Sequence, residues 1–439
     1  MDLTTLARLQ FGATACFHIL FPSLLIGLGL YLTWLEAAWL RSAKISYLVE
    51  YEFWLRLFGA AFLVAVITGA VLSFQLDGVF SGLYARSGSV LLPLRHAEFL
   101  NAVLLEAGCI GVMLFGRARV GGRLHFLATV TVTAGLIFSS VCIIMRNAWM
   151  QTPAGIEVHA GQIVLTSRWD MLLNASFPYR YVHVILGGCL STACVVAGIA
   201  AWYLLRRTHR LFATRTLQRA MWTIGLLGPL QIIAGDLHGL NTLQHQPMKI
   251  AAIEALWDTM TEAPLVLFAI PRSDREANSS SIEIPGLASV LLTHAYHGKL
   301  AGLKTVAAPD RPNVALVFFS FRLMVGCAVA MLLMPLSWWC RIGVRGRVGK
   351  PWLLRLYVAG APLGLIATVA GWCVAEAGRQ PWAIYGVVRT ADVIDPQWYI
   401  HGGSHGALAI GVAYALLLLL YLLHFGHVLR GGPKSVPAA

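Results

Sequence analysis

Six side chains that can bind iron or move protons lie within or at the ends of long apolar stretches of the 439-residue sequence. An ionisable group in hydrocarbon is energetically costly, so each one marks a candidate functional site. Histidine, methionine and carboxylate groups can serve as axial ligands of haem iron in an apolar pocket. The candidates are His18, Glu98, Glu106, His183, Met324 and Glu376. Their similar depth on different predicted helices would suit more than one haem.

Each candidate also has an ordinary structural explanation. A histidine in a membrane helix can be a packing residue, Met324 can fill the core, and Glu98 can be a helix start favoured by the helix dipole. Glu98 and Glu106 are eight residues apart, about 800° of helical turn, so they share a face to within roughly 80°. Two carboxylates on one buried face favour a proton path. Spacing alone therefore indicates a redox or proton-handling membrane protein and leaves the reaction open.

Transmembrane helices are the elements that must position these groups. The chain is 58% hydrophobic and only 12% charged, with a mean hydropathy of +0.70, which is too apolar for a soluble protein of this size. Windows of about twenty apolar residues, enough to cross a hydrocarbon core about 30 Å thick, occur near 11–39, 54–75, 98–116, 124–145, 181–205, 217–234, 314–340, 355–376 and 406–424. We predict an all-α integral membrane protein with about nine helices in a single domain, 1–439.

Basic residues gather in alternate short loops, near 41–44, 117–123, 206–219 and 341–355. The positive-inside rule therefore places these loops and the C-terminus in the cytoplasm and the N-terminus on the periplasmic side. The same rule accounts for the net charge of +13 without nucleic acid. The first helix lacks the basic flank and cleavage site of a signal peptide, so we expect it to be retained.

One long polar segment, 235–313, separates the sixth and seventh predicted helices and is expected on the periplasmic side. Long loops in compact domains usually have a function or are disordered. Within this loop Ile250, Ile253 and Trp257 recur at helical spacing, which predicts a short helix against the bundle. The eight cysteines form no CxxC pair and indicate neither a disulfide framework nor covalent haem attachment.

Seven short motifs follow one another along nearly the whole chain. They are "RLQFGATACFHILFPSLLIGL" with His18, "HAEFLNAVLLEAG" with Glu98 and Glu106, "RNAWMQTPAG" with Arg146 and Asn147, "YVHVILGG" with His183, "KIAAIEALW" with Lys249 and Glu254, "FSFRLMVGC" with Arg322 and Met324, and "WCVAEAGRQPW" with Trp372, Glu376 and Arg379. In this order they resemble subunit I of the cytochrome bd quinol oxidases. The short loop 235–313 is similar to that of the short-loop, cyanide-insensitive branch.

The resemblance implies a role for each of these residues. His183 and Met324 would bind a low-spin haem b, while His18 and Glu376 would bind two high-spin haems in an order that stays open. One of these is a haem b, and the other is haem d or a further haem b in its place. Further residues are implied in cofactor binding (Arg322, Trp372, Arg379 and Asn147, with Arg146 near propionates), in quinol binding (Lys249 and Glu254) and in proton transfer (Glu98 and Glu106). Pro381, which lacks an N–H, is expected to end the helix after Glu376.

The resemblance also implies an activity. Quinol would be oxidised at the periplasmic side and O2 reduced to water at the high-spin haems, which generates a proton gradient without pumping. The expected setting is the bacterial inner membrane, with lipid around the chain, a subunit II and sometimes a small single-helix subunit. Two alternatives are a diheme quinol dehydrogenase and a proton-coupled transporter, although the sequence has no symmetric broken helices of the kind transporters use.

Overall fold

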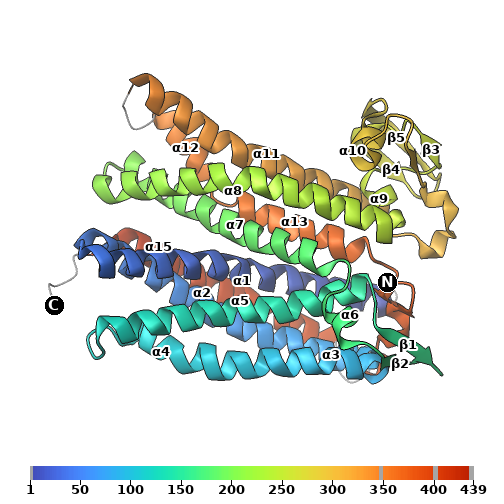
Figure 1. Cartoon of the computed structure of the whole chain (residues 1–439), viewed down its shortest axis with the longest axis horizontal. Coiled ribbons are helices and arrows are strands. Elements are labelled where there is room, and N and C mark those ends of the chain that lie inside the picture. The colour runs from blue at the N-terminus through green and yellow to red at the C-terminus, as the bar shows by residue number, and fades with distance from the viewer. Residues whose placement is uncertain (1–2, 346–349, 399–403, 435–439) are drawn as a thin grey trace.

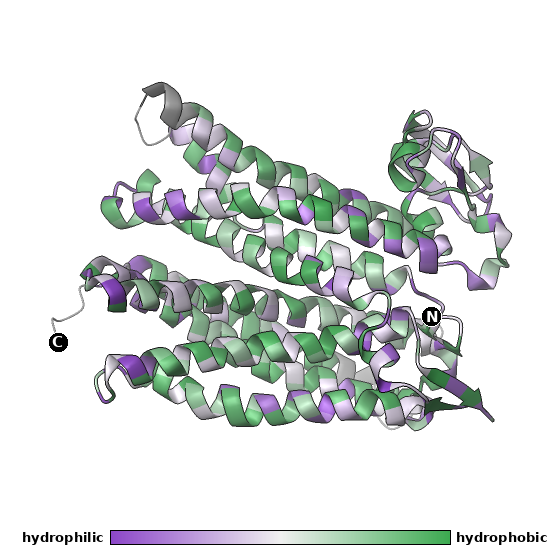
Figure 2. Ribbon diagram, in the orientation of Figure 1, coloured by the Kyte–Doolittle hydropathy of each residue, from purple (hydrophilic) through white to green (hydrophobic). Residues whose placement is uncertain are grey.

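The structure, a computed structural model, describes residues 3–345, 350–398 and 404–434. Within these residues nine helices are long and apolar enough to cross a membrane, in agreement with the predicted number. They form one elongated bundle (Figure 1), and hydrophobic residues occupy most of their length (Figure 2). The chain is therefore a multi-pass membrane protein.

The bundle helices follow the apolar windows of the sequence, with several extra turns at their ends. They are α1 (Leu3–Ser42), α2 (Ile45–Val79), α3 (Ser81–Asn101) continued by the π-helical η1 (Ala102–Ala107) and α4 (Gly108–Phe115), α5 (Gly122–Gln151), α6 (Arg168–Leu172) leading into α7 (Phe177–Leu205), α8 (Arg210–His245), α11 (Val314–Arg345), α12 (Pro351–Ala359) with α13 (Leu363–Ala377), and α15 (Ser404–Gly431). The largest buried apolar cluster includes Leu25, Trp54, Phe58 and Tyr203, which pack α1, α2 and α7 together.

Short strands and helices lie at the end of the bundle near the N-terminus (Figure 1). Four two-stranded antiparallel sheets form there: β1 (Ile156–His159) with β2 (Gln162–Leu165), β3 (Met260–Thr261) with β6 (Lys299–Leu300), β4 (Leu265–Arg272) with β5 (Ala277–Ile284), and β7 (Trp382–Ile384) with β8 (Val388–Arg389). Three short helices occur in the same segments of the chain. They are α9 (Pro247–Ile253) before β3, α10 (Leu287–Thr293) between β5 and β6, and α14 (Pro396–Trp398) before α15. The predicted short helix is confirmed as α9 for Ile250 and Ile253, but it ends at Ile253, so Trp257 lies in the turn beyond it; all three side chains are buried.

Two predicted boundaries were wrong because polar residues lower the hydropathy of a helix without ending it. Helix α3 begins at Ser81, so Glu98 lies well inside a helix and does not start one. Helix α8 continues to His245, so the long loop begins at Gln246 and extends to 313. The helix-start explanation of Glu98 is thereby excluded.

The ending of α13 also differs from the prediction. The helix stops at Ala377 and Gly378 caps it, three residues before Pro381. The residue before a proline disfavours the helical conformation, which favours a helix end ahead of Pro381, although Pro93 and Pro229 lie inside α3 and α8. Glu376 therefore lies in the last turn of α13, one residue before the helix ends.

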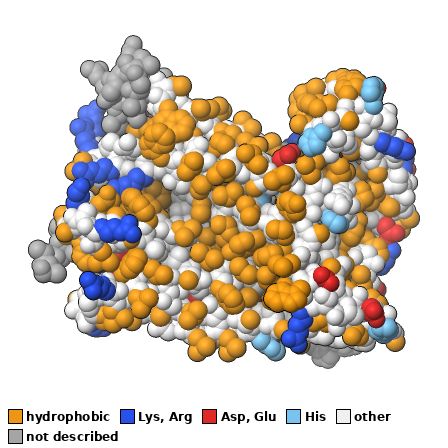
Figure 3. Space-filling view, viewed as in Figure 1, with side chains coloured by type: hydrophobic (Ala, Val, Ile, Leu, Met, Phe, Trp, Pro, Cys, Tyr) orange, Lys and Arg blue, Asp and Glu red, His pale blue; other side chains and the backbone are white. Residues whose placement is uncertain are grey.

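Charged side chains lie mostly near the two ends of the bundle, and hydrophobic side chains cover the face between them (Figure 3). A group of Lys and Arg side chains lies at the end opposite to the strands, where the turns between α4 and α5 and between α7 and α8 are found (Figures 1 and 3). Part of the basic stretch 341–355, namely 346–349, lies outside the described residues.

Candidate functional site

A large cavity of about 2680 Å³ lies among α1, α2, α3, α5 and α13. Eight of the predicted site residues line it, and they come from α1 (His18), α3 and η1 (Glu98 and Glu106), α5 (Arg146 and Asn147) and α13 with the turn after it (Trp372, Glu376 and Arg379). The fold therefore brings together residues that are up to 361 positions apart, since the first is 18 and the last is 379. The other predicted residues, His183, Arg322, Met324, Lys249 and Glu254, lie outside this cavity.

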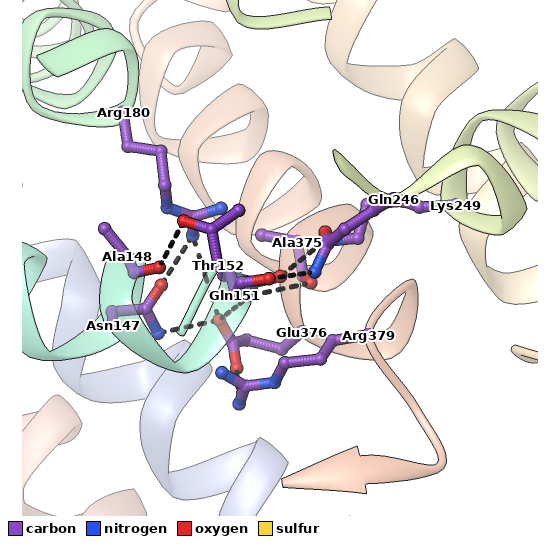
Figure 4. Close-up of polar contacts among 10 residues, drawn as sticks. All are labelled: Asn147, Ala148, Gln151, Thr152, Arg180, Gln246, Lys249, Ala375, Glu376 and Arg379. Carbon is purple, nitrogen blue, oxygen red and sulfur yellow. Dashed lines mark hydrogen bonds and ion pairs between the residues drawn. The ribbon is translucent and has the colours of Figure 1, made fainter. Parts of the chain in front are cut away.

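Glu376 is the most densely bonded residue of the cavity (Figure 4). Its Oε1 accepts hydrogen bonds from Asn147 Nδ2 at 2.8 Å and Gln151 Nε2 at 3.3 Å, and its Oε2 accepts one from Arg379 Nη2 at 2.5 Å. Arg180 Nη2 lies 4.0 Å from Oε1 and donates to Asn147 Oδ1 at 2.5 Å. These donors favour an ionised carboxylate. A carboxylate has about four acceptor positions, so three donors leave one, on Oε2, that a metal ion could use.

Lys249 belongs to the same network, although the sequence motif placed it in a quinol site with Glu254. Its Nζ donates to Gln151 Oε1 at 2.6 Å, and only 3% of the residue is exposed. Burial lowers the pKa of Lys249 well below its usual range, and the charge of Arg180 lowers it further. Lys249 is linked through Gln151 to the Glu376 cluster.

Glu254 faces the other way. Residues 249 and 254 are five positions apart, about 500° of helical turn, so their side chains point to different sides of α9. The Glu254 carboxylate accepts a hydrogen bond from Arg322 Nη2 at 2.9 Å, while the same guanidinium donates to the Val266 carbonyl. Burial raises the pKa of Glu254, and the positive charge of Arg322 opposes that rise. The pair forms a second polar site between α9 and α11.

The surroundings of His18 fit a haem ligand. Its Nδ1 lies 2.8 Å from the Thr68 hydroxyl, which fixes the ring and directs Nε2 toward a ligand position. Gly69 faces the imidazole, and a Cβ there would lie 3.3 Å from Cε1. The absence of a side chain at 69 therefore gives the ring and its ligand room.

His183 and Met324 also have surroundings that a haem would need. The Nδ1 atom of His183 is buried without a hydrogen-bond partner among the described residues, while Nε2 contacts Gln231 at 3.2 Å. Gly235 faces the same ring, and a Cβ on Gly371 would lie 3.0 Å from the Met324 sulfur. His183 has a buried ring nitrogen without a partner, and Gly235 and Gly371 leave space beside His183 and Met324. These features would suit two residues that together hold a haem.

Glu98 and Glu106 bind different partners on one helical rod. Glu98 pairs with Arg146, which the sequence analysis had placed near haem propionates. Glu106 is buried, and its Oε1 accepts hydrogen bonds from Asn101 at 3.0 Å and Ser139 at 2.8 Å. Glu106 belongs to the π-helical segment η1, and the wider turn of η1 changes the rotation of Glu106 relative to Glu98 from the value expected for a regular α-helix.

Several residues of these sites were not singled out from the sequence. Arg180, Gln151 and Thr68 have no motif of their own, although Gln151 lies within "RNAWMQTPAG" and Arg180 is three positions before His183. A polar residue inside an apolar helix was the available signal. Its partner could not be read from the chain, because the contacts to Glu376 and His18 join different helices.

Comparisons with known proteins agree with this arrangement. Residues 6–433 match the family model described as cytochrome bd terminal oxidase subunit I. The chain is 31% identical to cytochrome bd ubiquinol oxidase subunit 1 of Bacillus subtilis (strain 168), over 99% of this chain and 95% of that protein. It is 29% identical to cytochrome bd-II ubiquinol oxidase subunit 1 of Escherichia coli (strain K12), over 96% and 93%.

A solved structure has the same fold. The structure of bd oxidase from Geobacillus thermodenitrificans superimposes with a TM-score of 0.89 at 27% identity, covering 98% of this chain and 99% of that one. The sequence resemblance is thus confirmed over almost the full length. The chain belongs to the cytochrome bd terminal oxidase subunit I family.

Proposed function

We propose that this chain is the haem-binding subunit of a quinol oxidase that reduces O2 to water, as the names of its ubiquinol oxidase relatives suggest. The observation that supports this most directly is the Glu376 site. A carboxylate held by Arg379, Asn147 and Gln151 keeps one acceptor position free, and Glu376 and His18 line the same large cavity. Such a ligand suits a metal centre at which a second position stays open.

Membership of the family implies haem, and the residues present fit it. His183 and Met324 would hold a low-spin haem b, and His18 and Glu376 would hold a high-spin haem b and a haem d, or a further haem b in its place. Bound haem supplies electron transfer and O2 reduction. Arg379 and Asn147 hold the Glu376 carboxylate ionised and oriented, Trp372 lines the cavity, and Thr68 orients His18.

The residues of the chain would also handle protons and quinol. Glu254 is the proposed acceptor of a phenolic proton from quinol, and Arg322 orients it. Lys249 is no longer paired with Glu254 in this proposal, because it binds Gln151. Glu106, hydrogen-bonded to Asn101 and Ser139, and Glu98, paired with Arg146, would pass protons toward the cavity that both line.

The orientation of the chain would give the reaction its direction. The loop after α8 and the N-terminus would lie on the periplasmic side of the bacterial inner membrane, and the C-terminus in the cytoplasm. Quinol protons would then leave outside while the protons of water formation come from inside, which builds a gradient without a pump. The relatives are named subunit 1, which implies a subunit II partner; a small single-helix subunit is a further candidate.

A reduced-minus-oxidised visible spectrum of the purified complex, with quinol-driven O2 consumption, tests this function. We expect both low-spin and high-spin haem bands and O2 uptake that requires quinol. Low-spin bands without O2 uptake would indicate the diheme quinol dehydrogenase, and an absence of haem bands the proton-coupled transporter.

A further inference from the structure

A second buried cluster of ionisable residues lies at the end of the bundle opposite to the strands, where α1 ends and α5 begins. The Glu36 side chain is fully buried, and its carboxylate contacts polar side chains of three residues. Its Oε1 lies 2.6 Å from His125 Nδ1 and 3.6 Å from Arg117 Nη2, and its Oε2 accepts a hydrogen bond from Thr129 at 2.6 Å. None of the roles proposed above uses these residues.

The Glu36 carboxylate has one titratable partner within hydrogen-bond distance, which is His125. Around Glu36 the titratable groups are Tyr51 and Glu52 of α2, Arg117 of the turn before α5, and His125 of α5. Arg117 is shared, because its Nε lies 2.5 Å from Glu52 Oε1. Glu52 also interacts with Arg56, one turn further along α2. Glu36 itself has the His125 ring at 2.6 Å and the more distant Arg117 Nη2 at 3.6 Å, so His125 is the partner with which it can exchange a proton.

His125 has an acceptor that the protein itself does not use. Only 1% of the residue is exposed, and its Nε2 has no hydrogen-bond partner among the described residues. With Nδ1 donating to the Glu36 carboxylate, Nε2 is a free lone pair in a buried site. A buried unpaired acceptor is costly. It therefore indicates a position where a proton, or a water that brings one, can bind.

The same helix links this cluster to Glu106. On α5, His125, Thr129 and Thr133 follow at intervals of four, so they lie along one face, and Ser139 further on donates to Glu106. The Thr133 hydroxyl donates to the Thr129 carbonyl at 2.8 Å. Ser139 is six positions after Thr133, about 9 Å along the helix, a gap that water would have to bridge.

The large cavity offers a parallel connection. Its lining includes Glu52, which shares Arg117 with Glu36, and also Ser139 and Glu106. A third of the Glu52 side chain is exposed, whereas Glu36 is closed off from solvent. The Glu36 cluster therefore lies between Glu52, which solvent can reach at this end of the bundle, and Glu106, which lies deeper inside.

We propose that Glu36 and His125 share one mobile proton and pass it on toward Glu106, along α5 or through the large cavity. This inference rests on the proposed function, since it needs protons to enter from the end of the bundle that holds the basic turns. Proton exchange between the two groups breaks one N–H or O–H bond as it forms the other, and needs no further reactant.

Glu50 provides a matched control. It is also a buried carboxylate of the same end of the bundle, but it pairs with Arg219 and accepts further hydrogen bonds from Tyr31 and from Thr216 at 2.8 Å. One carboxylate there matches one guanidinium, so the charges balance without a proton. Glu50→Gln should therefore leave turnover close to that of the unaltered complex.

The test compares Glu36→Gln, His125→Gln, Glu36→Asp and Glu50→Gln in the purified complex between pH 6 and pH 9. In the first two variants, quinol should still reduce all haems without O2. Steady-state O2 consumption should fall by about tenfold or more, the scale on which a proton-transfer group acts. The loss should grow as pH rises, because protons become scarcer, and Glu36→Asp should recover most of the rate.

Four results would overturn the proposal. The first is a Glu36→Gln or His125→Gln complex with all its haems and a normal pH profile. The second is an equal loss in Glu50→Gln, which would show a general effect of removing buried charge. The third is failure of both variants to assemble, which would make the pair structural, and the fourth is an equal loss in Glu36→Asp. Failure of the unaltered complex to consume O2 with quinol would instead contradict the proposed function.

Discussion

At the scale of single residues, the chemistry of the chain depends on which partner each polar group receives. His18, Met324 and Glu376 are each placed beside a feature that a bound haem would need: a hydrogen bond to Thr68, a glycine at 371, and a set of three donors. The same side chains in other surroundings would be packing residues. Two predictions follow from these placements.

The first concerns Met324. Met324→Leu nearly conserves volume and should cost less than about 1.5 kcal/mol of stability. The variant should keep its fold but lose the low-spin haem band, because leucine has no sulfur to bind iron. Met331→Leu, at a buried position on the same helix, is the control and should leave the spectrum unchanged. A normal low-spin band in Met324→Leu would refute the ligand assignment.

The second concerns the two high-spin sites. His18→Ala and Glu376→Ala should each abolish O2 reduction while quinol still reduces the haem held by His183, because each change removes one iron ligand from the large cavity. The absorption band that disappears assigns the haem to the residue, and His159→Ala, on an exposed strand, is the control. Normal O2 consumption by both alanine variants would mean that the active site lies elsewhere.

At the scale of elements, short segments outside the long helices decide where quinol chemistry can occur. Helix α9 and the turn after it bury Ile250, Ile253 and Trp257 against the bundle and direct Lys249 and Glu254 to different sides. The sequence predicts which residues of α9 are buried, but not which helices its two polar sides contact. One side meets the Glu376 cluster and the other meets Arg322 on α11.

This division predicts a selective effect at Glu254. Glu254→Gln is nearly isosteric, so haem spectra should be preserved while the quinol-driven rate falls or the quinol KM rises. An artificial donor that bypasses quinol should reduce the haems normally. Because burial raises the pKa of Glu254, the carboxylate form is lost as pH falls from neutral toward that pKa, and the quinol-driven rate should fall with it.

The glutamine variant should lack this acidic limb, because an amide does not titrate. Glu283→Gln, on the exposed strand β5, should match the unaltered complex. Unaltered quinol kinetics in Glu254→Gln would place the quinol site elsewhere, and loss of both electron-donor routes would indicate structural damage.

At the scale of the whole molecule, the bundle has two chemically different ends. The strands, α9 and α10 lie at one end, and the turns rich in Lys and Arg lie at the other (Figures 1 and 3). The Glu376 cluster lies nearer the first end, in the last turn of α13, and the Glu36 cluster lies at the second. A directed flow of protons between the two ends would require a fixed orientation in the membrane.

Thiol labelling of intact cells tests that orientation. Ser273→Cys, in the exposed turn between β4 and β5, should react with a maleimide that cannot cross the membrane, because this turn is expected outside. Ala118→Cys, in the exposed turn between α4 and α5, should react only after the cells are opened. The native Cys340 is also exposed and serves as an internal reference for the inner side. The opposite labelling pattern would reverse the proposed direction of proton movement.

The sequence by itself determined the membrane class, the number of long helices and the family. These follow from hydropathy summed along about twenty residues and from short motifs, which are both local properties of the chain. It also identified His18, Glu98, Glu106 and Glu376, which the structure brings to one cavity. Helix ends were less certain, because residues such as Pro93 or Asp236 lower hydropathy without ending a helix that neighbours support.

Only the tertiary structure decided which polar groups meet. Lys249 binds Gln151, 98 positions away, and Glu36 binds His125, 89 positions away. Such pairs depend on the rotation and axial offset of each helix relative to its neighbours, which are set by side-chain packing across the whole bundle. No property of one helix contains that information. For this reason the separation of Lys249 from Glu254 could not be read from the sequence.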